Sequence, residues 1–158
     1  MSNSLCYQQL KHLRLAHRLY SKAPSFNLKK QDDTGKTTDM IGPANPVSNL
    51  RPIIFAQPST ETDIEKKFRE TREATQEWNH KFWSAHNARF IAERKEFQNQ
   101  LKAEGKESVT ADEMSVFYKK FLDSNWETHV KYNYLWYKQN IKILYLEVRV
   151  RLSKMKFK

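Results

Sequence analysis

Large side chains recur at helical spacing in the middle of the chain. They fall three, four or seven positions apart, which places them on one face of a helix. The positions on this face are Thr75, Trp78, Phe82, His86, Phe90, Phe97 and Leu101. Charged and amide residues fill the positions between them, as on a helix with one solvated face. Thr62 and Glu65 form a capping-box pattern before this stripe and Gly105 follows it, so we expect one helix between these points.

A second helical pattern begins after a short linker. Thr110 and Glu113 form another capping box, and Phe117 and Phe121 open the apolar pattern behind it. From there one line of positions continues at spacings of three, four or seven: Trp126, Val130, Asn133, Tyr137, Ile141, Leu144, Val148 and Leu152. The polar residues at 123–125 predict a kink or a break in this helix. Residues 148–152 alternate with period two, which also fits a strand, but helix is favoured because no strand partner is visible.

Two helical segments of similar length with a short linker predict an all-α fold, a long antiparallel helical hairpin. Counting outward from the linker pairs positions whose numbers sum to about 215. The expected neighbours are Phe97 with the region of Tyr118, Phe90 with Asn125 and Trp126, His86 with His129, and Trp78 with Tyr137.

The first 60 residues have a different character. Residues 1–31 contain six lysines and arginines, no acidic residue and an amphipathic leucine pattern, which is typical of a mitochondrial transit peptide. We expect residues 1–20 to be that peptide, with cleavage after Tyr20; a basic arm that binds RNA or membrane is the alternative. Residues 21–60 are expected to be a linker and an extended proline-rich arm, of which residues 41–55 lie along the helices. Residues 61–158 then form the helical domain.

Composition narrows the function. The formal charge is +10, which suits an anionic membrane surface, an acidic protein or nucleic acid. The single cysteine, Cys6, cannot build a disulfide, a paired-cysteine copper site or a CxxC redox pair within one chain. The sequence carries no HExxH, GxSxG or glycine-rich phosphate loop, so we expect a protein that is not an enzyme.

The meeting of the two aromatic stripes has two interpretations. The first is a hydrophobic core, in which ring pairs add about 0.5–1.5 kcal/mol each beyond their burial. The second is a haem site, because His86 and His129 at one level of a helical pair could ligate iron between aromatic walls. The absence of a CxxCH sequence means that any haem would be bound reversibly.

The C-terminal segment combines apolar positions with a cluster of cations. Lysines and arginines lie between and beside Ile141, Leu144 and Val148, so this end could lie on an anionic bilayer. The candidate membrane-surface residues are Lys142, Arg149, Arg151, Lys154 and Lys156. An ordinary charged helix end and a site for RNA backbone are the alternatives.

Several stretches, in order between about residues 40 and 145, resemble one family. They are Ile41-Gly42-Pro43, Ser48-Asn49-Leu50-Arg51-Pro52, Thr75-Gln76-Glu77-Trp78-Asn79, Phe82-Trp83, Glu113-Met114, Phe117-Tyr118-Lys119, Phe121-Leu122, His129, Tyr132-Asn133, Trp136-Tyr137-Lys138 and Asn140. Together they are similar to the cytochrome c oxidase assembly factor 8 family, also called apoptogenic protein 1. His129 lies in a matching stretch, whereas His80 and His86 lie where the family pattern does not require histidine.

The resemblance implies a protein of the mitochondrial matrix, peripherally associated with the inner membrane, that supports assembly of respiratory complex IV. It would bind a subunit or assembly intermediate in a chaperone-like manner. The expected partner-binding residues are Asn49, Arg51, Trp78, Asn79, Trp83, Trp136 and Tyr137. A haem-handling protein, with His86 and His129 as ligands, is one alternative function. A basic mitochondrial RNA-binding protein is another.

Overall fold

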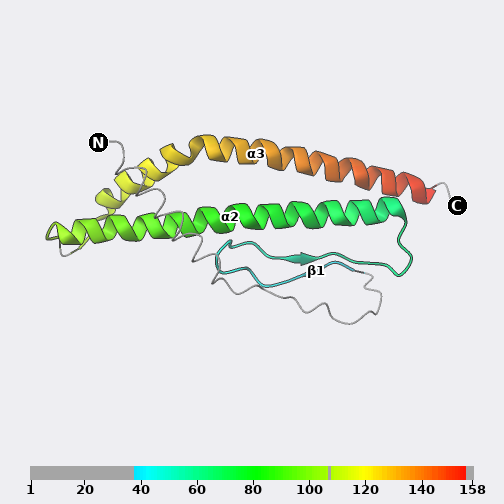
Figure 1. Ribbon diagram of the computed structural model, residues 1–158, viewed down its shortest axis with the longest axis horizontal. Helices are drawn as coiled ribbons and strands as arrows, with labels where there is room; N and C mark the ends of the chain where they lie inside the picture. The colour runs from blue at the N-terminus through cyan, green and yellow to red at the C-terminus, as the bar shows by residue number, and fades with distance from the viewer. Residues whose placement is uncertain (1–37, 107, 156–158) are drawn as a thin grey trace, which may run out of the picture.

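The computed structural model describes residues 38–106 and 108–155, and this part of the chain is dominated by two long helices. Helix α2 spans Asp63–Ala103 and helix α3 spans Ala111–Met155. They run side by side in opposite directions, with the linker at one end (Figure 1). The predicted antiparallel helical hairpin is therefore confirmed. The predicted transit peptide, residues 1–20, lies outside the described residues.

Both helices begin where the capping boxes predict. The Thr62 hydroxyl accepts a hydrogen bond from the Glu65 backbone N–H, and a Glu65 carboxylate oxygen accepts one from the Thr62 backbone N–H. Thr110 and Glu113 exchange the same two bonds at the start of α3. After α2 ends, Gly105 adopts φ +88°, a left-handed conformation that suits glycine at a helix terminus. These local signals place the linker and therefore define the hairpin.

Helix α3 is continuous through residues 123–125, so the predicted break does not occur. The helix bends in its first third as it approaches α2 at the linker end (Figure 1). The Ser124 hydroxyl and the Asn125 amide both donate to the Phe121 carbonyl oxygen, at 3.0 and 2.7 Å. Side chains that bond back to the preceding turn in this way often bend helices. Residues 148–152 are helical, so the strand alternative is wrong.

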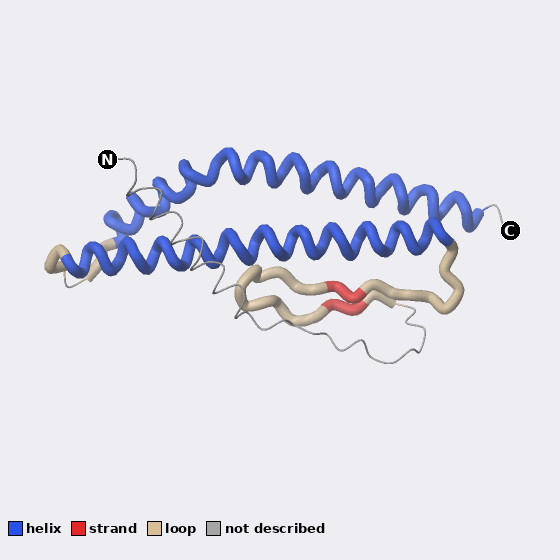
Figure 2. The backbone as a smooth tube through the Cα atoms, in the orientation of Figure 1, coloured by secondary structure: helices blue, strands red, loops and turns tan. Residues whose placement is uncertain are grey.

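A narrow β-hairpin lies along α2 on the side away from α3 (Figure 2). Strands β1, Met40–Ile41, and β2, Ile53–Ile54, are antiparallel, with Met40 opposite Ile54. The Gly42 N–H donates to the Pro52 carbonyl oxygen at 2.8 Å, and a Cβ on Gly42 would lie 3.0 Å from the Pro52 ring. Residues 38–60, the described part of the expected arm, therefore contain a folded hairpin.

The buried residues of α3 do not follow the line that periodicity singles out. The buried ones are Phe117, Phe121, Asn125, Tyr132, Leu146 and Val150. By contrast, the positions expected to face α2 are largely exposed, with Trp126 at 68%, Tyr137 at 63% and Ile141 at 67%. That expectation is wrong because α3 has two lines of apolar residues on opposite sides, and the buried line carries polar residues.

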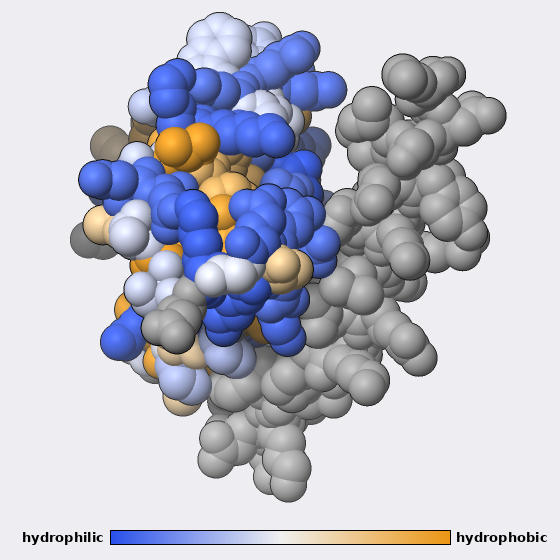
Figure 3. All heavy atoms as spheres, turned by 90° about the vertical axis from the view of Figure 1, so that its left-hand side faces the viewer, coloured by the Kyte–Doolittle hydropathy of each residue, from blue (hydrophilic) through white to orange (hydrophobic). Residues whose placement is uncertain are grey.

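The linker end of the molecule is largely hydrophilic. Seen from the linker end, hydrophilic side chains cover most of the visible surface, with apolar atoms between them (Figure 3). Neither described helix contains a stretch that is long enough and apolar enough to cross a membrane.

Candidate functional site

Tyr132 is the centre of the contact between the two helices. Its ring stacks on Phe82, with centroids 4.1 Å apart, and on Trp78, with centroids 5.2 Å apart. Its hydroxyl accepts a hydrogen bond from the Trp83 indole N–H at 2.9 Å and donates one to the Asn79 side-chain oxygen at 2.6 Å. We call these five residues the Tyr132 cluster. The cluster joins two polar groups of α2 through a single hydroxyl of α3.

The cluster corrects the expected pairing of Trp78 with Tyr137. Trp78 stacks on Tyr132 instead, while the Tyr137 ring packs edge-on against its neighbour Trp136 and is 63% exposed. Tyr132 and Tyr137 lie about 140° apart around the helix, so only one of them can face α2. The side chains of Trp78, Asn79 and Trp83, which we expect to bind a partner, all contact Tyr132 within the hairpin. Their role in partner binding stays a prediction.

The expected partners of Phe90 are also wrong by about one helical turn. The Phe90 ring contacts the rings of Phe117, Tyr118 and Phe121, with the Phe121 centroid 5.1 Å away. Nearer the linker the expectation holds, since Phe97 stacks on Phe117 beside the predicted Tyr118 level, with centroids 5.5 Å apart. The register estimate is thus right for Phe97 and about one turn off for Phe90.

His86 and His129 meet as the register predicts, with ring centroids 4.7 Å apart and planes inclined by 56°. Three further rings contact His86, namely Phe82, Trp83 and Phe121. Burial, together with the smaller effects of charge at His129 and Arg89, lowers the pKa of His86 to about 4. His86 is therefore neutral at pH 7, and one of its ring nitrogens carries a lone pair that can accept a hydrogen bond or bind a metal ion.

Two buried polar atoms of α3 have no hydrogen bond to any described residue. They are Nε2 of His129 and Oδ1 of Asn125, whose residue is only 1% exposed. Buried polar groups are usually paired, so these two are exceptions with a free-energy cost. No three His, Cys, Asp or Glu side chains in residues 38–106 and 108–155 are grouped so that they could hold a metal ion.

The packing around the two histidines bears on the haem hypothesis. An iron held by both rings needs a nitrogen about 2 Å from the metal on each side and a macrocycle between the rings. In the structure the rings are packed against each other, 4.7 Å apart at their centroids. Haem ligation by this pair would therefore require α2 and α3 to move apart.

Polar side chains of α2 hold the β-hairpin in place. The Gln76 side-chain oxygen accepts a bond from the Ile53 N–H at 2.7 Å, and its NH₂ donates to the Ile53 carbonyl at 2.9 Å. Farther along α2, the Asn87 NH₂ donates to the Val47 carbonyl at 2.9 Å. Gln76 thus satisfies both backbone groups of one strand residue, as a neighbouring strand would.

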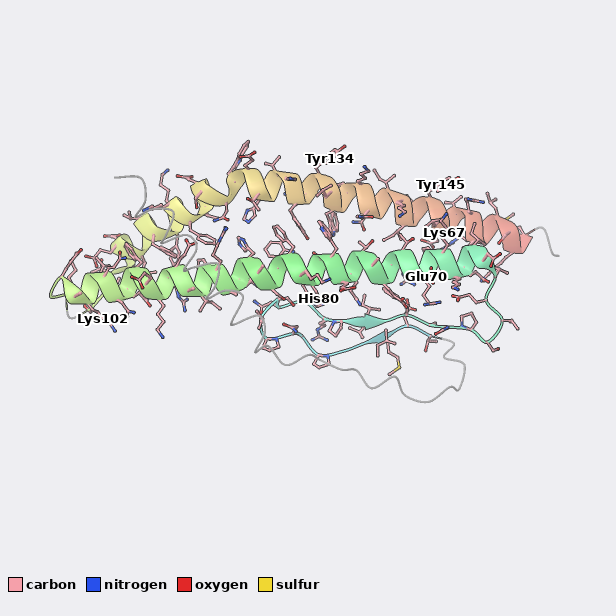
Figure 4. The ribbon with its side chains drawn as sticks, in the orientation of Figure 1. Lys67, Glu70, His80, Lys102, Tyr134 and Tyr145 are labelled. Atoms are coloured by element: carbon pink, nitrogen blue, oxygen red, sulfur yellow. The ribbon has the colours of Figure 1, made fainter. Side chains whose placement is uncertain are left out.

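A serine and a histidine form the third link. The buried Ser48 hydroxyl accepts a bond from the Leu50 N–H and lies 3.0 Å from Nδ1 of His80. His80 extends from the side of α2 that faces the hairpin (Figure 4). The tautomer of His80 decides which of the two groups donates, and Nδ1 can accept the hydroxyl proton only when the imidazole is neutral. Burial lowers the pKa of His80, which favours the same state.

Asn49 and Arg51, two of the expected partner-binding residues, lie on this hairpin and are exposed. Asn49 has φ +60°, a left-handed conformation that asparagine tolerates better than most residues. The Asn45 side-chain oxygen accepts bonds from the backbone N–H groups of Val47 and Ser48, which completes the turn. The residue type at Asn49 is thus accounted for by the turn, whereas nothing within the described chain accounts for Arg51.

The exposed side of α3 is the feature that the sequence reading missed. Its large apolar residues follow one another at intervals of three or four along the helix, and we call this row the outer stripe. Its members are Trp126, Val130, Tyr134, Tyr137, Ile141, Leu144, Val148 and Leu152, with exposures of 46–68%. Tyr134 and the neighbouring Tyr145 extend from α3 on the side away from α2 (Figure 4). The sequence shows the spacing of the stripe, but its apolar character predicts a position in the interior.

The expected membrane-surface cations differ in their surroundings. Arg151 pairs with Glu147 at 2.5 Å, and Lys154 pairs with Glu65 of α2 at 2.8 Å. Lys142 and Arg149 are exposed and form no ion pair within the described residues. Lys156 lies outside them. Two of the five cations are thus engaged within the hairpin, and Lys154 ties the end of α3 to the start of α2.

Comparison with known sequences identifies the family. A sequence profile of cytochrome c oxidase assembly factor 8 matches residues 38–156, which include the β-hairpin and both helices. The chain belongs to the cytochrome c oxidase assembly factor 8 family. The match therefore covers all of the described part of the chain. No solved structure matches the chain.

Curated relatives of this family occur in several animals. The Bos taurus cytochrome c oxidase assembly factor 8 is 42% identical over 127 residues, which are 74% of this chain and 66% of the bovine protein. The Homo sapiens protein of that name is 40% identical over 127 residues, 74% of this chain and 62% of its own length. A Drosophila melanogaster family member named as mitochondrial is 40% identical over 126 residues, 80% of this chain and 72% of its own length. The match thus spans slightly less than two thirds of the bovine and human proteins.

Proposed function

We propose that this chain supports the assembly of cytochrome c oxidase by binding one of its subunits or an assembly intermediate. The observation that carries the proposal is the match of the family profile across the hairpin and both helices. Relatives in cattle and humans bear the name of an assembly factor for this enzyme. Such a role needs a binding surface, and the outer stripe with the exposed Trp136 and Tyr137 offers one.

The proposed place of action is the mitochondrial matrix, at the surface of the inner membrane. Relatives from Drosophila and Caenorhabditis are named as mitochondrial, and the first 31 residues have the composition of a transit peptide. Anionic lipid headgroups would compete with a protein partner for the exposed Lys142 and Arg149, each cation near the surface contributing about 1 kcal/mol. Because Arg151 and Lys154 are already paired, attachment to the membrane would be weak and reversible.

A genetic complementation experiment tests the assembly role. The full chain is expressed in cells that lack their own family member, and assembled complex IV is quantified by native electrophoresis together with oxidase activity. We expect both to recover, while the amount of complex III stays constant. Unchanged complex IV, with the chain present in mitochondria at normal levels, would refute the proposal.

Haem handling is the second candidate, and the contact of His86 with His129 among aromatic rings is the observation that favours it. Titration of the purified chain with haem, followed at the Soret band, tests it. Replacing either histidine by alanine should then shift the band, with helix content unchanged. A titration that shows only the spectrum of free haem would remove this candidate and leave the assembly role untouched.

A further inference from the structure

The outer stripe is more apolar than the side of α3 that is buried against α2. The buried side carries Asn125, 1% exposed, and His129, both with an unpaired polar atom. The outer stripe consists of tryptophan, tyrosine and branched aliphatic residues from Trp126 to Leu152, a length of about 40 Å. Scattered exposed apolar residues are ordinary, but a continuous row marks an interaction surface.

The spacing of the outer stripe is that of a helix-packing seam. Its intervals of three and four residues match those at the start of the buried line, in which Phe117 and Phe121 contact rings of α2 and Asn125 is buried. A stripe with this spacing stays on one side of a helix and can receive the side chains of another helix laid along it. Its shape therefore fits a third helix packed against α3.

Cations without an ion pair in the described residues line one border of the stripe, beside the exposed Glu127, whereas Arg151 on the other border is paired with Glu147. Lys131, Lys138, Lys142 and Arg149 follow one another at intervals of seven and four, and we call them the basic edge. All four are exposed and form no ion pair within the described residues. The Arg149 guanidinium lies over the Tyr145 ring, 5.8 Å from its centroid.

The opposite border of the stripe is close to neutral. It carries Asn133 and Asn140, and its single carboxylate, Glu147, is already paired with Arg151. The partner that complements such a surface has an apolar face and acidic side chains along one side of it.

This charge distribution argues against a second copy of the chain as the occupant. In an antiparallel two-fold pairing of two stripes, like edges meet, so the basic edge would face the basic edge of the other copy. In a parallel pairing the basic edge would face Asn133, Asn140 and the Glu147–Arg151 pair, whose charges cancel. Neither arrangement supplies the carboxylates that the lysines lack.

The one-sided charge also favours a helix over a lipid surface as the occupant of the outer stripe. A helix lying on an anionic bilayer meets headgroups on both borders of its apolar face, so cations on both sides are favourable. Here free cations lie on one border, and the other presents amides and an internal ion pair. A partner with its charge along one side matches this asymmetry better than a planar surface.

We infer that the outer stripe and the basic edge of α3 bind an amphipathic helix of a partner protein that carries acidic residues along one side. This inference rests on the proposed function, and it identifies the surface through which a complex IV subunit or intermediate would be held. The contact makes a three-helix layer in which α3 is the central helix.

Peptide binding to the purified full chain tests the chemistry of the surface. The probe is a synthetic helical peptide with leucines at intervals of three and four and glutamates along one border, and its counterpart carries lysines in place of the glutamates. Fluorescence anisotropy should show binding of the acidic peptide alone, weakened by salt. Ile141→Glu and Lys142→Glu should each weaken it about tenfold or more. The matched controls Ile91→Glu and Lys95→Glu, on exposed positions of α2, should change it less than about twofold.

Vesicles containing cardiolipin form the competing arm. If the chain binds vesicles through Ile141 and Lys142 and does not bind the acidic peptide, the surface is a lipid surface and the inference fails. Equal binding of both peptides, or full binding by Ile141→Glu, would also overturn it. Circular dichroism of each variant shows whether it is folded, which these exposed positions should allow.

Complementation separates the inference from the proposed function. If the wild-type chain fails to restore complex IV, the proposed function fails. If the wild type and Ile91→Glu restore it and Ile141→Glu does not, the inference is supported. Equal recovery with Ile141→Glu would refute the inference alone. A photo-crosslinker at position 141, but not at position 91, should join the chain to a complex IV protein.

Discussion

Removing one oxygen atom from the Tyr132 cluster should measurably destabilise the hairpin. Tyr132→Phe keeps the ring that stacks on Phe82 and Trp78 and deletes the hydroxyl that bonds to Trp83 and Asn79. An indole N–H and an amide oxygen then lose their partners between the helices. The change therefore isolates hydrogen bonding from packing.

The expected cost follows from the two lost bonds. A hydrogen bond contributes about 0.5–1.5 kcal/mol net, and a buried group left unpaired costs about 1–3 kcal/mol. Trp83 and Asn79 are half-buried, so water can partly replace the lost bonds. We therefore expect the free energy of unfolding to fall by about 2–3 kcal/mol. For a chain of this length, that lowers the Tm by roughly 5–10 °C.

Urea unfolding followed by circular dichroism measures the change, and Tyr134→Phe provides the control. Tyr134 is 68% exposed on the outer stripe, so removing its hydroxyl should change the free energy of unfolding by no more than about 0.5 kcal/mol. A double-mutant cycle with Asn79→Ala should give a coupling of at least about 0.5 kcal/mol. Equal stability of the two Tyr→Phe variants would refute the role assigned to the Tyr132 hydroxyl.

Three further outcomes are expected. His129→Leu should leave unfolding in urea unchanged or make it harder, because a buried nitrogen without a partner is replaced by an apolar group; a loss above about 1 kcal/mol would show that the imidazole has a partner. Gln76→Ala should speed proteolysis of the β-hairpin by releasing both backbone groups of Ile53, whereas Gln100→Ala, at an exposed site, should not. Since the folded pKa of His86, about 4, lies below its ordinary 6.5, protonation favours the unfolded chain; stability should be full above pH 6.5 and fall towards pH 4, and His86→Phe should flatten a Tm profile over that range.

The helices and their ends could be predicted because their causes are local. The capping boxes at Thr62 and Thr110 and the turn at Gly105 act over a few residues, so the sequence shows them directly. The level of His86 against His129 followed from the linker, since two antiparallel helices pair residues at nearly equal distances along the chain from it. These features required no knowledge of distant contacts.

The face of α3 could not be predicted from periodicity, because two lines of residues compete. The line through Trp126 and Ile141 is the more apolar, and it lies outside. The line through Asn125 and Tyr132 lies inside, where Tyr132 finds two hydrogen-bond partners on α2 and Asn125 bonds to its own backbone. Burial here depends on partners that are distant in sequence, which a pattern within one helix cannot show.

The anchoring of the β-hairpin also depended on such distant contacts. Gln76, His80 and Asn87 look like ordinary polar positions on the outside of a helix. Their role appears only when the backbone of residues 47–53 lies against them. The sequence indicated that residues 41–55 contact the helices, but it did not show which side chains of α2 receive them.

The pairing of the two helices determines the order in which contacts can form as the chain folds. Trp83 and Tyr132 lie 49 positions apart in sequence, and the pair formed by Glu65 and Lys154 closes the end farthest from the linker. Contacts beside the linker close the shortest loops and cost the least entropy, so folding should zip from Phe97 and Phe117 outward. During synthesis, α2 must therefore wait with its aromatic face in water until α3 emerges. Amide exchange should follow the same order, fastest at the Lys154 end of α3 and slowest near Phe117.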